Sequence, residues 1–283
     1  MLNGCAYILT VDVGNTFIRF GLFAEDSAAA EEFPLATCEI TTPSSITADE
    51  ARMRLAQVMA ALAADAGMPG ALVPTAAVLS CVVPALERPW KAALSRTCTG
   101  RVLTVGPGLK TGMPVHYDDP AEIGPDRIAD AVAARAVYGS PCIVIDLGTT
   151  TNIEVIDTHG TFVGGVIAPG LALGARSLSA AAARLPQVEP SAPTHVIGRN
   201  TREAMRSGVV LGEVARIDGM LDMVLAEMRA TKAAGEGDVP IVITGDDAEA
   251  LAALVGHSLT VDDALTLRGL AELYRINQKP RRV

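Results

Sequence analysis

Hydrophobic and polar positions along this chain form a pattern that occurs twice. In each copy, short apolar runs typical of β-strands precede longer stretches with apolar residues three and four positions apart, which are typical of amphipathic helices. The first copy is predicted to contain strands at 7–13, 17–23, 33–40, 76–83 and 101–105 and helices at 48–66 and 85–94. The second is predicted to contain strands at 142–147, 152–156, 161–167 and 241–244 and helices at 171–184, 201–228, 247–255 and 264–276.

Each copy opens on the same short motif, Asp-x-Gly-(Asn/Thr)-Thr, at a turn between two predicted strands. The first is VDVGNT at residues 11–16 and the second is IDLGTT at residues 145–150. One such turn is explained by an ordinary Gly-Asn hairpin, but two at corresponding positions indicate a duplicated pair of domains with a cleft between them. We therefore predict an α/β fold with domains at 1–116 and 117–283, in which the helix 127–138 crosses into the second half.

The motif suits the binding of a phosphate and a metal. A carboxylate such as Asp12 at the end of a strand can hold Mg²⁺, directly or through water, because Mg²⁺ prefers oxygen ligands and keeps part of its hydration shell. Gly14 lets backbone amides approach a phosphate closely, and Asn15 and Thr16 add side-chain donors. The sequence thus predicts a nucleotide site at this turn.

Composition and charge exclude several other classes of protein. The net charge of −9 argues against a general nucleic-acid surface, and no apolar run reaches the roughly 20 residues of a membrane span. The five cysteines are scattered without metal-ligand spacing, which favours free thiols in a reducing compartment. The histidines show no metal spacing either. We expect a cytoplasmic protein that binds neither nucleic acid nor membranes.

Two Asp-Gly-Thr hairpins without a P-loop sequence resemble the superfamily of actin, sugar kinases and heat-shock ATPases, which implies two ribonuclease-H-like (actin-like ATPase) domains with a nucleotide cleft between them. Longer segments narrow the resemblance, which covers nearly the whole chain, to type III pantothenate kinases. The most specific of them are VGPGLKTGMPVHYDDPAEIGPDRIADAVAA, FVGGVIAPGLALGARSL and IGRNTREAMRSGVVLG. The resemblance implies phosphorylation of pantothenate by ATP to 4′-phosphopantothenate, the first step of coenzyme A biosynthesis, with Mg²⁺, a monovalent cation (K⁺ or NH₄⁺) and a homodimer.

The resemblance also implies roles for individual residues. It assigns the proton acceptor to Asp126, and the chemistry agrees, because an alcohol that attacks a phosphoryl group benefits from a nearby carboxylate. Pro125 suits the start of a helix, whose amides would keep that carboxylate ionised; a helix cap is the alternative role of Asp126. The implied contacts to pantothenate are Tyr117, Gly124, Pro125, Asp126, Arg127 and Thr201.

The other implied contacts concern the nucleotide and the cations. Arg127 can clamp the carboxylate of pantothenate with two parallel hydrogen bonds, whereas Thr201 has the alternative role of a helix N-cap. Asp146 matches the ligand of the monovalent cation, and Asp12 that of Mg²⁺. The implied nucleotide contacts are Asp12, Val13, Gly14, Asn15, Thr16, Phe17, Ile18, Arg19 and Thr149.

The chain departs from the family pattern at several positions. Thr244-Gly245-Asp246 replaces the usual Thr-Gly-Gly, and Asn152 and Glu154 follow the second motif where the family usually has threonine and aspartate. A carboxylate at position 246 is expected either to weaken nucleotide binding or to cap the following helix. These departures leave an alternative open, a catalytically silent relative that acts as a regulatory or transcriptional accessory protein.

Overall fold

The computed structural model describes residues 6–25, 33–68 and 72–278, and these divide into two compact units. The first unit takes in residues up to Pro114, then Asp118–Val137, and the chain from Ala264 onward. The second takes in Val115–Tyr117 and Tyr138–Asp263. The packing units therefore do not coincide with a single cut between residues 116 and 117, and that boundary stays a prediction about the ancestral duplication.

The first unit is built on a five-stranded sheet in the order β3-β2-β1-β4-β5. β1 pairs antiparallel with β2 and parallel with β4, so it forms the centre of the sheet. The strands are β1 (Tyr7–Val13), β2 (Phe17–Ala24), β3 (Ala36–Thr41), β4 (Ala76–Cys81) and β5 (Val102–Thr104). The helices are α1 (Ala48–Asp65), α2 (Pro84–Thr97), the 3₁₀ turn η1 (Pro120–Glu122), α3 (Pro125–Tyr138) and α8 (Leu265–Ile276).

Alternation along β1 sends its side chains to two different faces of this sheet. Leu9, Val11 and Val13 pack into a core with α1 and α2. Thr10 lies on the other face, where a side chain at Gly21 would meet both Thr10 and Leu267 of α8. The same alternation places Asp12 on the face that α8 covers.

Helices α3 and α8 pack closely within the first unit. Gly269 of α8 lies so near the backbone of Ala129 in α3 that a side chain there would collide with the Ala129 carbonyl. α3 thus packs with the first unit as far as Val137, and the chain passes into the second unit at the last residue of the helix, Tyr138. An amphipathic pattern says which face of a helix is buried but not which sheet it meets, so the packing of α3 with the first unit could not be foreseen.

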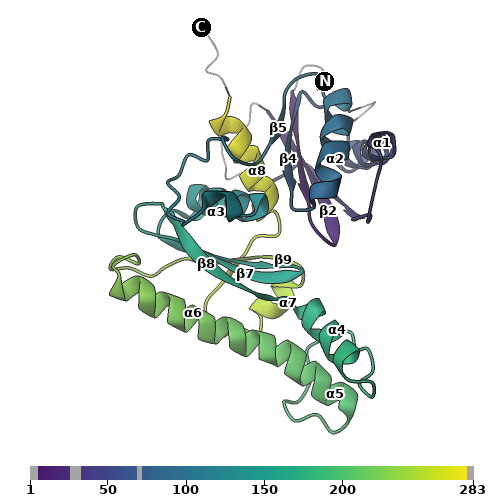
Figure 1. The fold of residues 1–283 in the computed structure, drawn as a ribbon. Helices are drawn as coiled ribbons and strands as arrows, with labels where there is room; N and C mark the ends of the chain where they lie inside the picture. Colours follow the sequence, from purple (N-terminus) through teal and green to yellow (C-terminus); the bar gives the residue numbers. More distant parts are fainter. Residues whose placement is uncertain (1–5, 26–32, 69–71, 279–283) are drawn as a thin grey trace. The chain divides into compact units, whose positions relative to one another are not determined.

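The second unit repeats the topology of the first, with the sheet order β10-β9-β6-β7-β8 and β6 at its centre. Figure 1 labels three of these strands, β7, β8 and β9. β6 pairs antiparallel with β7 and parallel with β9. The strands are β6 (Cys142–Leu147), β7 (Thr150–Ile156), β8 (Phe162–Pro169), β9 (Ile241–Gly245) and β10 (Thr260–Val261). The helices are α4 (Leu171–Ala181), α5 (Thr201–Arg206), the π-helical segment η2 (Ser207–Leu211), α6 (Gly212–Ala230) and α7 (Ala248–Ala252). The predicted α/β fold of two duplicated ribonuclease-H-like domains is confirmed.

The predicted helix 201–228 is interrupted. A π-helical segment separates α5 from α6, although the three elements follow one another along a common line in Figure 1. The Ser207 hydroxyl in this segment donates a hydrogen bond to the Val196 carbonyl, outside the helix. The next residue, Gly208, is a weak helix former, so regular α-helix is disfavoured at this turn. The face of α6 expected to be buried does meet the sheet, through Val214, Ile217 and Leu221.

Candidate functional site

The β1–β2 turn is held by its own backbone and by the chain after β3. The Gly14 amide donates to the Phe17 carbonyl over 3.0 Å, and the Thr42 hydroxyl donates to the Gly14 carbonyl over 2.8 Å. Asn15 and Thr16 are exposed and can meet a ligand with their side chains. Val13 and Ile18 lie in the core, so only their backbones can contact a nucleotide. Phe17 and Arg19 are half-buried.

Asp12 lies just before this turn with its carboxylate buried. Its side chain is 7% exposed, and its Oδ1 atom has no hydrogen-bond partner among the described residues. The pKa of Asp12 is raised to about 6, chiefly by burial and to a smaller extent by the negative charge of Asp126, whereas the Ser80 hydroxyl and the Arg19 guanidinium offset part of the effect. Arg19 is the residue opposite Asp12 on β2, and it forms an ion pair of 3.0 Å with Glu39.

Asp126 lies in the first turn of α3, after Pro125. Its Oδ1 atom accepts a hydrogen bond of 2.9 Å from the Arg127 amide, and a side chain at Gly124 would collide with it. Gly124 therefore makes room for the carboxylate. Arg127 is 5% exposed, and its positive charge lowers the pKa of Asp126.

The pKa of Asp126 is shifted in the direction opposite to the one that the helix amides alone would produce. Burial raises the pKa of this carboxyl, and this effect outweighs the backbone hydrogen bonds and the Arg127 charge, which lower it. The amide contact is present as predicted, but the desolvation of the side chain comes from tertiary packing. The buried Asp12 and the half-buried Asp126 thus form a pair of carboxylates in which the charge of Asp126 disfavours ionisation of Asp12.

The second motif turns between β6 and β7. The Gly148 amide donates to the Thr150 carbonyl over 3.0 Å, and the Thr149 carbonyl accepts from the Gly170 amide over 3.1 Å. Neither Gly170 nor Gly245 has room for a side chain, because each lies against the backbone of this turn. A side chain at Gly245 would also come within 2.8 Å of Asp146 Oδ1. Asp146 and Thr149 are therefore held in a tightly packed corner of the second unit.

The remaining predicted site residues also lie in the second unit. The Tyr117 ring packs against the Phe162 ring, with centroids 6.1 Å apart. Thr201 is the first residue of α5 and is exposed, whereas the N-cap is Asn200, whose side chain accepts from the Glu203 amide over 3.0 Å. The capping role considered for Thr201 is therefore wrong.

The comparison with known families agrees with these motifs. The family model "Type III pantothenate kinase" matches residues 8–223. This chain belongs to the type III pantothenate kinase family. A family member from Nocardia farcinica is 39% identical over 279 residues, covering 97% of this chain and 99% of the relative. Another, from Koribacter versatilis, is 37% identical over 275 residues and covers 96% of each chain.

Solved structures bear on the fold alone. A protein from Campylobacter jejuni described as a conserved putative Baf family transcriptional activator has a TM-score of 0.57 at 18% identity, covering 95% of this chain and 98% of that one. The ethanolamine utilization protein EutJ from Carboxydothermus hydrogenoformans has a TM-score of 0.52 at 15% identity, covering 94% of this chain and 89% of that one. Both likenesses agree with the duplicated fold of this pantothenate kinase family member.

The carboxylates of this family member fit the cations of a kinase. Mg²⁺ in kinases is held by one or two carboxylates together with substrate phosphates and water, and the buried, unbonded Oδ1 of Asp12 provides such a ligand. Within the residues that the structure describes, no three His, Cys, Asp or Glu side chains converge on a metal. Asp146 offers a carboxylate oxygen for a monovalent cation beside the backbone of Gly245.

A buried polar network that the sequence analysis missed supports the second turn. The Thr151 hydroxyl donates to Glu213 Oε1 over 2.7 Å, and Arg216 donates to Glu213 Oε2 and to the Pro169 carbonyl. The network thereby joins the start of β7 and the end of β8 to α6. The sequence signal for this network is the spacing of Glu213 and Arg216, three residues apart on one helix face, which favours an ion pair between them. That spacing does not indicate that Thr151 and Pro169 of the strands take part.

Asp246 lies directly beside the second turn. Its amide donates to the Leu147 carbonyl over 2.5 Å, at the end of β6. The N-cap of α7 is Asp247, at φ 58° and without a side-chain cap, and α7 spans Ala248–Ala252 instead of the predicted 247–255. Asp247, not Asp246, thus occupies the N-cap position of α7.

The described cysteines are free thiols of low reactivity. Cys38, Cys81, Cys98 and Cys142 are free thiols, and Cys5 lies outside the described residues. Burial raises the pKa of Cys142 to about 12 and that of Cys81 to about 11, so these thiols are poor nucleophiles at neutral pH.

None of the helices in the described ranges has both the length and the apolarity needed to cross a membrane.

Proposed function

We propose that this chain transfers the γ-phosphate of ATP to pantothenate, forming 4′-phosphopantothenate at the start of coenzyme A biosynthesis. Membership of the pantothenate kinase family supports this reaction. The structural observation that carries it is the pair of carboxylates formed by the buried Asp12 and the half-buried Asp126, whose charges interact within the first unit. A kinase needs one carboxylate for its metal and one for the proton of its acceptor, and the pair provides both.

Asp126 is the proton acceptor in this proposal. The primary hydroxyl oxygen of pantothenate forms a bond to the γ-phosphorus while the bond from that phosphorus to the β–γ bridging oxygen breaks, and ADP leaves. The hydroxyl proton passes to a carboxylate oxygen of Asp126. Its raised pKa suits this task, because a stronger base accepts the proton more readily. Arg127 binds the pantothenate carboxylate, and Tyr117, Gly124, Pro125 and Thr201 complete the acceptor site.

The nucleotide contacts come from the two turns. In the first, residues 12–19 include the exposed donors Asn15 and Thr16, and in the second Thr149 adds a further contact. Asp12 holds Mg²⁺, which when bound neutralises charge on the transferred phosphoryl group. Asp146 holds the monovalent cation, K⁺ or NH₄⁺.

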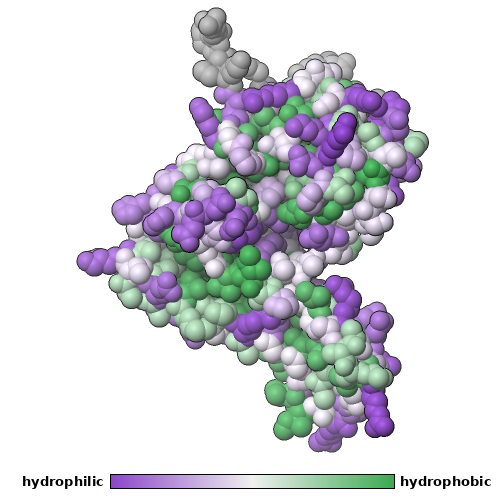
Figure 2. All heavy atoms as spheres, viewed as in Figure 1, coloured by the Kyte–Doolittle hydropathy of each residue, from purple (hydrophilic) through white to green (hydrophobic). Residues whose placement is uncertain are grey.

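The proposal includes a cytoplasmic homodimer that binds neither nucleic acid nor membranes. Apolar side chains on the outside of the second unit support self-association. Val196 and Ile197, just before α5, are 74% and 82% exposed, and Leu178 of α4 is also exposed. Figure 2 shows apolar surface at this α4–α5 end of the unit. Exposed apolar groups that gather in one place are typical of an interface.

A coupled assay for ADP tests the proposed reaction. The protein is incubated with ATP, MgCl₂, KCl and pantothenate, and the phosphorylated product is identified by mass spectrometry. We expect ADP release that depends on pantothenate. Nucleotide binding without pantothenate-dependent turnover, at any concentration of K⁺ or NH₄⁺, would contradict the kinase activity and favour a silent relative.

Substitution of Arg127 by lysine tests the acceptor site. Lysine keeps the charge but loses the planar fork that binds a carboxylate with two hydrogen bonds, so we expect the KM for pantothenate to rise roughly tenfold and the KM for ATP to change much less. Arg135→Lys is the matched control, because Arg135 lies on the same helix and bonds only the Gly112 carbonyl. A change confined to the KM for ATP would show that Arg127 contacts ATP and not pantothenate.

Substitution of Asp246 by glycine tests the repulsion expected beside the nucleotide. A carboxylate about 4 Å from a phosphate oxygen costs roughly 1–4 kcal/mol, depending on the effective dielectric. We expect Asp246→Gly to lower the KM for ATP at least severalfold and to leave the KM for pantothenate unchanged. Asp247→Asn removes the same charge one residue later and should not change the KM for ATP. Equal affinity for ATP in wild type and Asp246→Gly, measured by calorimetry, would refute the repulsion.

A further inference from the structure

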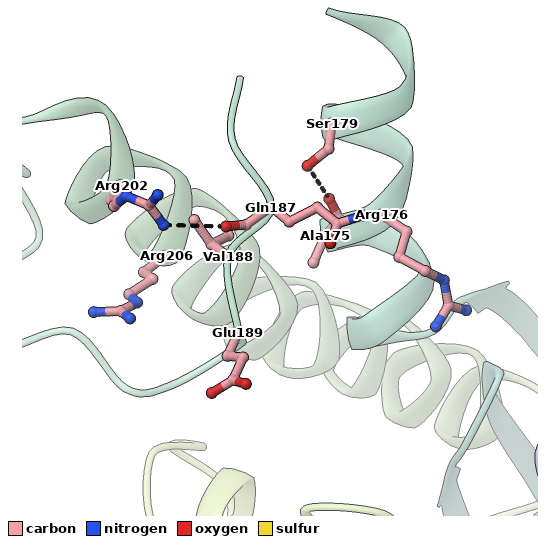
Figure 3. Close-up of a pocket in the computed structure, with 8 residues that line it drawn as sticks. All are labelled: Ala175, Arg176, Ser179, Gln187, Val188, Glu189, Arg202 and Arg206. Carbon is pink, nitrogen blue, oxygen red and sulfur yellow. Dashed lines mark hydrogen bonds between the residues drawn. The ribbon is translucent and has the colours of Figure 1, made fainter. Parts of the chain in front are cut away.

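A cavity of about 470 Å³ lies in the second unit, between α4, the segment 187–189 and α5 (Figure 3). Its volume falls in the range of small-molecule sites, roughly 300–1,000 Å³. None of the residues assigned above to ATP, pantothenate or the cations lines it. It is therefore a separate candidate site.

Two arginines of α5, one helical turn apart, line this cavity, and Arg202 points toward the segment 187–189 (Figure 3). The Arg202 Nη1 atom donates a hydrogen bond of 3.2 Å to the Gln187 carbonyl, which positions the guanidinium and leaves its other donors available to a ligand. The Arg206 Nε atom is buried, and no hydrogen-bond partner for it exists among the described residues. Because this Nε atom has almost no accessible surface, a ligand in the cavity would contact Arg206 through its terminal guanidinium nitrogens.

The charge around the cavity is opposite to that of the chain as a whole. Arg176, Arg202 and Arg206 line it together with one carboxylate, Glu189, whereas the whole chain carries a net charge of −9. Figure 3 shows that the Arg176 side chain extends from α4 away from α5, so the two α5 arginines form the positive end of the cavity. Ala175 and Val188 supply apolar wall. Glu203 interacts with the charge of Arg206, but its carboxylate accepts a hydrogen bond from the Arg199 amide.

We propose that this cavity binds a small phosphorylated molecule, with its phosphate on Arg202 and Arg206 and its organic part against Ala175 and Val188. Two guanidinium groups match a doubly charged phosphate better than a singly charged carboxylate, because each can donate two parallel hydrogen bonds to it. The volume exceeds that of a free phosphate, which implies an organic part. The binding would be independent of the proposed catalytic reaction, since the two use different residues.

Calorimetry on the full chain tests this proposal. The nucleotide site is first filled with a non-hydrolysable ATP analogue and Mg²⁺, so that phosphate cannot bind there. The probe is glycerol 3-phosphate. Glycerol and acetate, which lack the phosphate, are the control ligands. We expect saturable binding of glycerol 3-phosphate, at least tenfold weaker binding of acetate, and none of glycerol.

Variants at the cavity identify where the probe binds. Arg206→Gln should weaken the binding of glycerol 3-phosphate at least tenfold, and Arg206→Lys should weaken it less, because it keeps the charge without the fork. Arg229→Gln is the matched control, since Arg229 is an exposed arginine of α6 in the same unit. It should bind as wild type does. The thermal midpoint of each variant verifies that it folds.

Several outcomes would overturn the proposal. These are no saturable binding in the wild type, binding that Arg206→Gln leaves unchanged, an equal loss in Arg229→Gln, or acetate binding as tightly as the phosphate. Competition by pantothenate would also overturn it, because the cavity would then be part of the acceptor site next to Thr201. None of these results depends on whether the chain phosphorylates pantothenate, so the two proposals fail independently.

Discussion

Replacing Asp126 by asparagine should lower kcat for pantothenate phosphorylation by roughly 10²–10⁴-fold, the usual contribution of a positioned general base. Asparagine is nearly isosteric but cannot accept the proton of the attacking hydroxyl. KM for ATP should change little, because the nucleotide contacts come from other residues. Steady-state kinetics with both substrates varied separates these effects.

The fold should survive this substitution. The amide oxygen of asparagine can still accept the hydrogen bond of 2.9 Å that the Arg127 amide donates to Asp126. Asp119→Asn is a matched control, because Asp119 also accepts from a backbone amide at the start of a helical turn, over 3.0 Å from Ala121, and is exposed. The control should keep wild-type turnover. An Asp126→Asn enzyme with nearly normal kcat would remove Asp126 from the mechanism and leave it as a helix cap.

The pH profile gives an independent measure of the same base. Burial raises the pKa of Asp126 above its ordinary value of 3.8, so the acid limb of kcat/KM should lie above that value. Asp12 and Asp126 interact, so the limb reports the carboxyl pair and not one residue. We expect Asp126→Asn to lose the part of the limb that the base contributes. An unchanged limb would assign the titration to another group.

Much of the fold could be predicted from the sequence, because its signals are local. The strands on either side of Gly14 and Gly148 follow from short apolar runs and turn residues, and the duplication follows from the repeated motif. The placement of α3 and α8 could not be predicted, since the close contact between Ala129 and Gly269 joins residues far apart in the chain. The two-residue strand β10 was missed because so short a run carries no periodic signal.

The candidate site was predictable in its residue types but not in its electrostatics. The motifs placed Asp12 and Asp126 correctly at a strand end and a helix start. The raised pKa of Asp126 was not foreseen, because desolvation depends on what packs around the side chain. The bond from Thr151 to Glu213 was missed for the same reason, since it connects β7 with α6 across a long stretch of sequence.

Substitution of Asp12 by asparagine should abolish most kinase activity and yet stabilise the protein when no metal or nucleotide is bound. A pKa that rises from 3.8 to about 6 on folding means that the ionised carboxylate disfavours the folded state. At about 1.4 kcal/mol per pKa unit the penalty at pH 7 is at most about 3 kcal/mol, and we expect a gain of about 1–3 kcal/mol in Asp12→Asn. The gain should appear as a higher denaturation midpoint.

The dependence of this gain on pH distinguishes it from a simple packing effect. Below pH 3.8 the Asp12 carboxyl is protonated in both the folded and the unfolded chain. The charge at this position should therefore cause little difference in stability between wild type and Asp12→Asn. As the pH rises through about 6, the folded protein loses its bound proton and wild type loses stability, whereas the asparagine variant has no such proton. The difference in denaturation midpoint should therefore grow from pH 4 to pH 7. Asp238→Asn removes an exposed charge of the same sign and should show no such growth.

Addition of Mg²⁺ and ADP should then reverse the order of stability. In the wild type, Asp12 is proposed to hold the cation, so binding replaces an unfavourable buried charge with a paired one and raises the midpoint by mass action. Asp12→Asn lacks the carboxylate and should gain much less from the same ligands. A variant that gains as much as the wild type would exclude Asp12 as the metal ligand. A variant that is less stable than the wild type at pH 7 without ligands would instead mean that the Asp12 charge is compensated within the folded chain. The two measurements together test whether the carboxylate destabilises the unliganded fold because it is reserved for a cation.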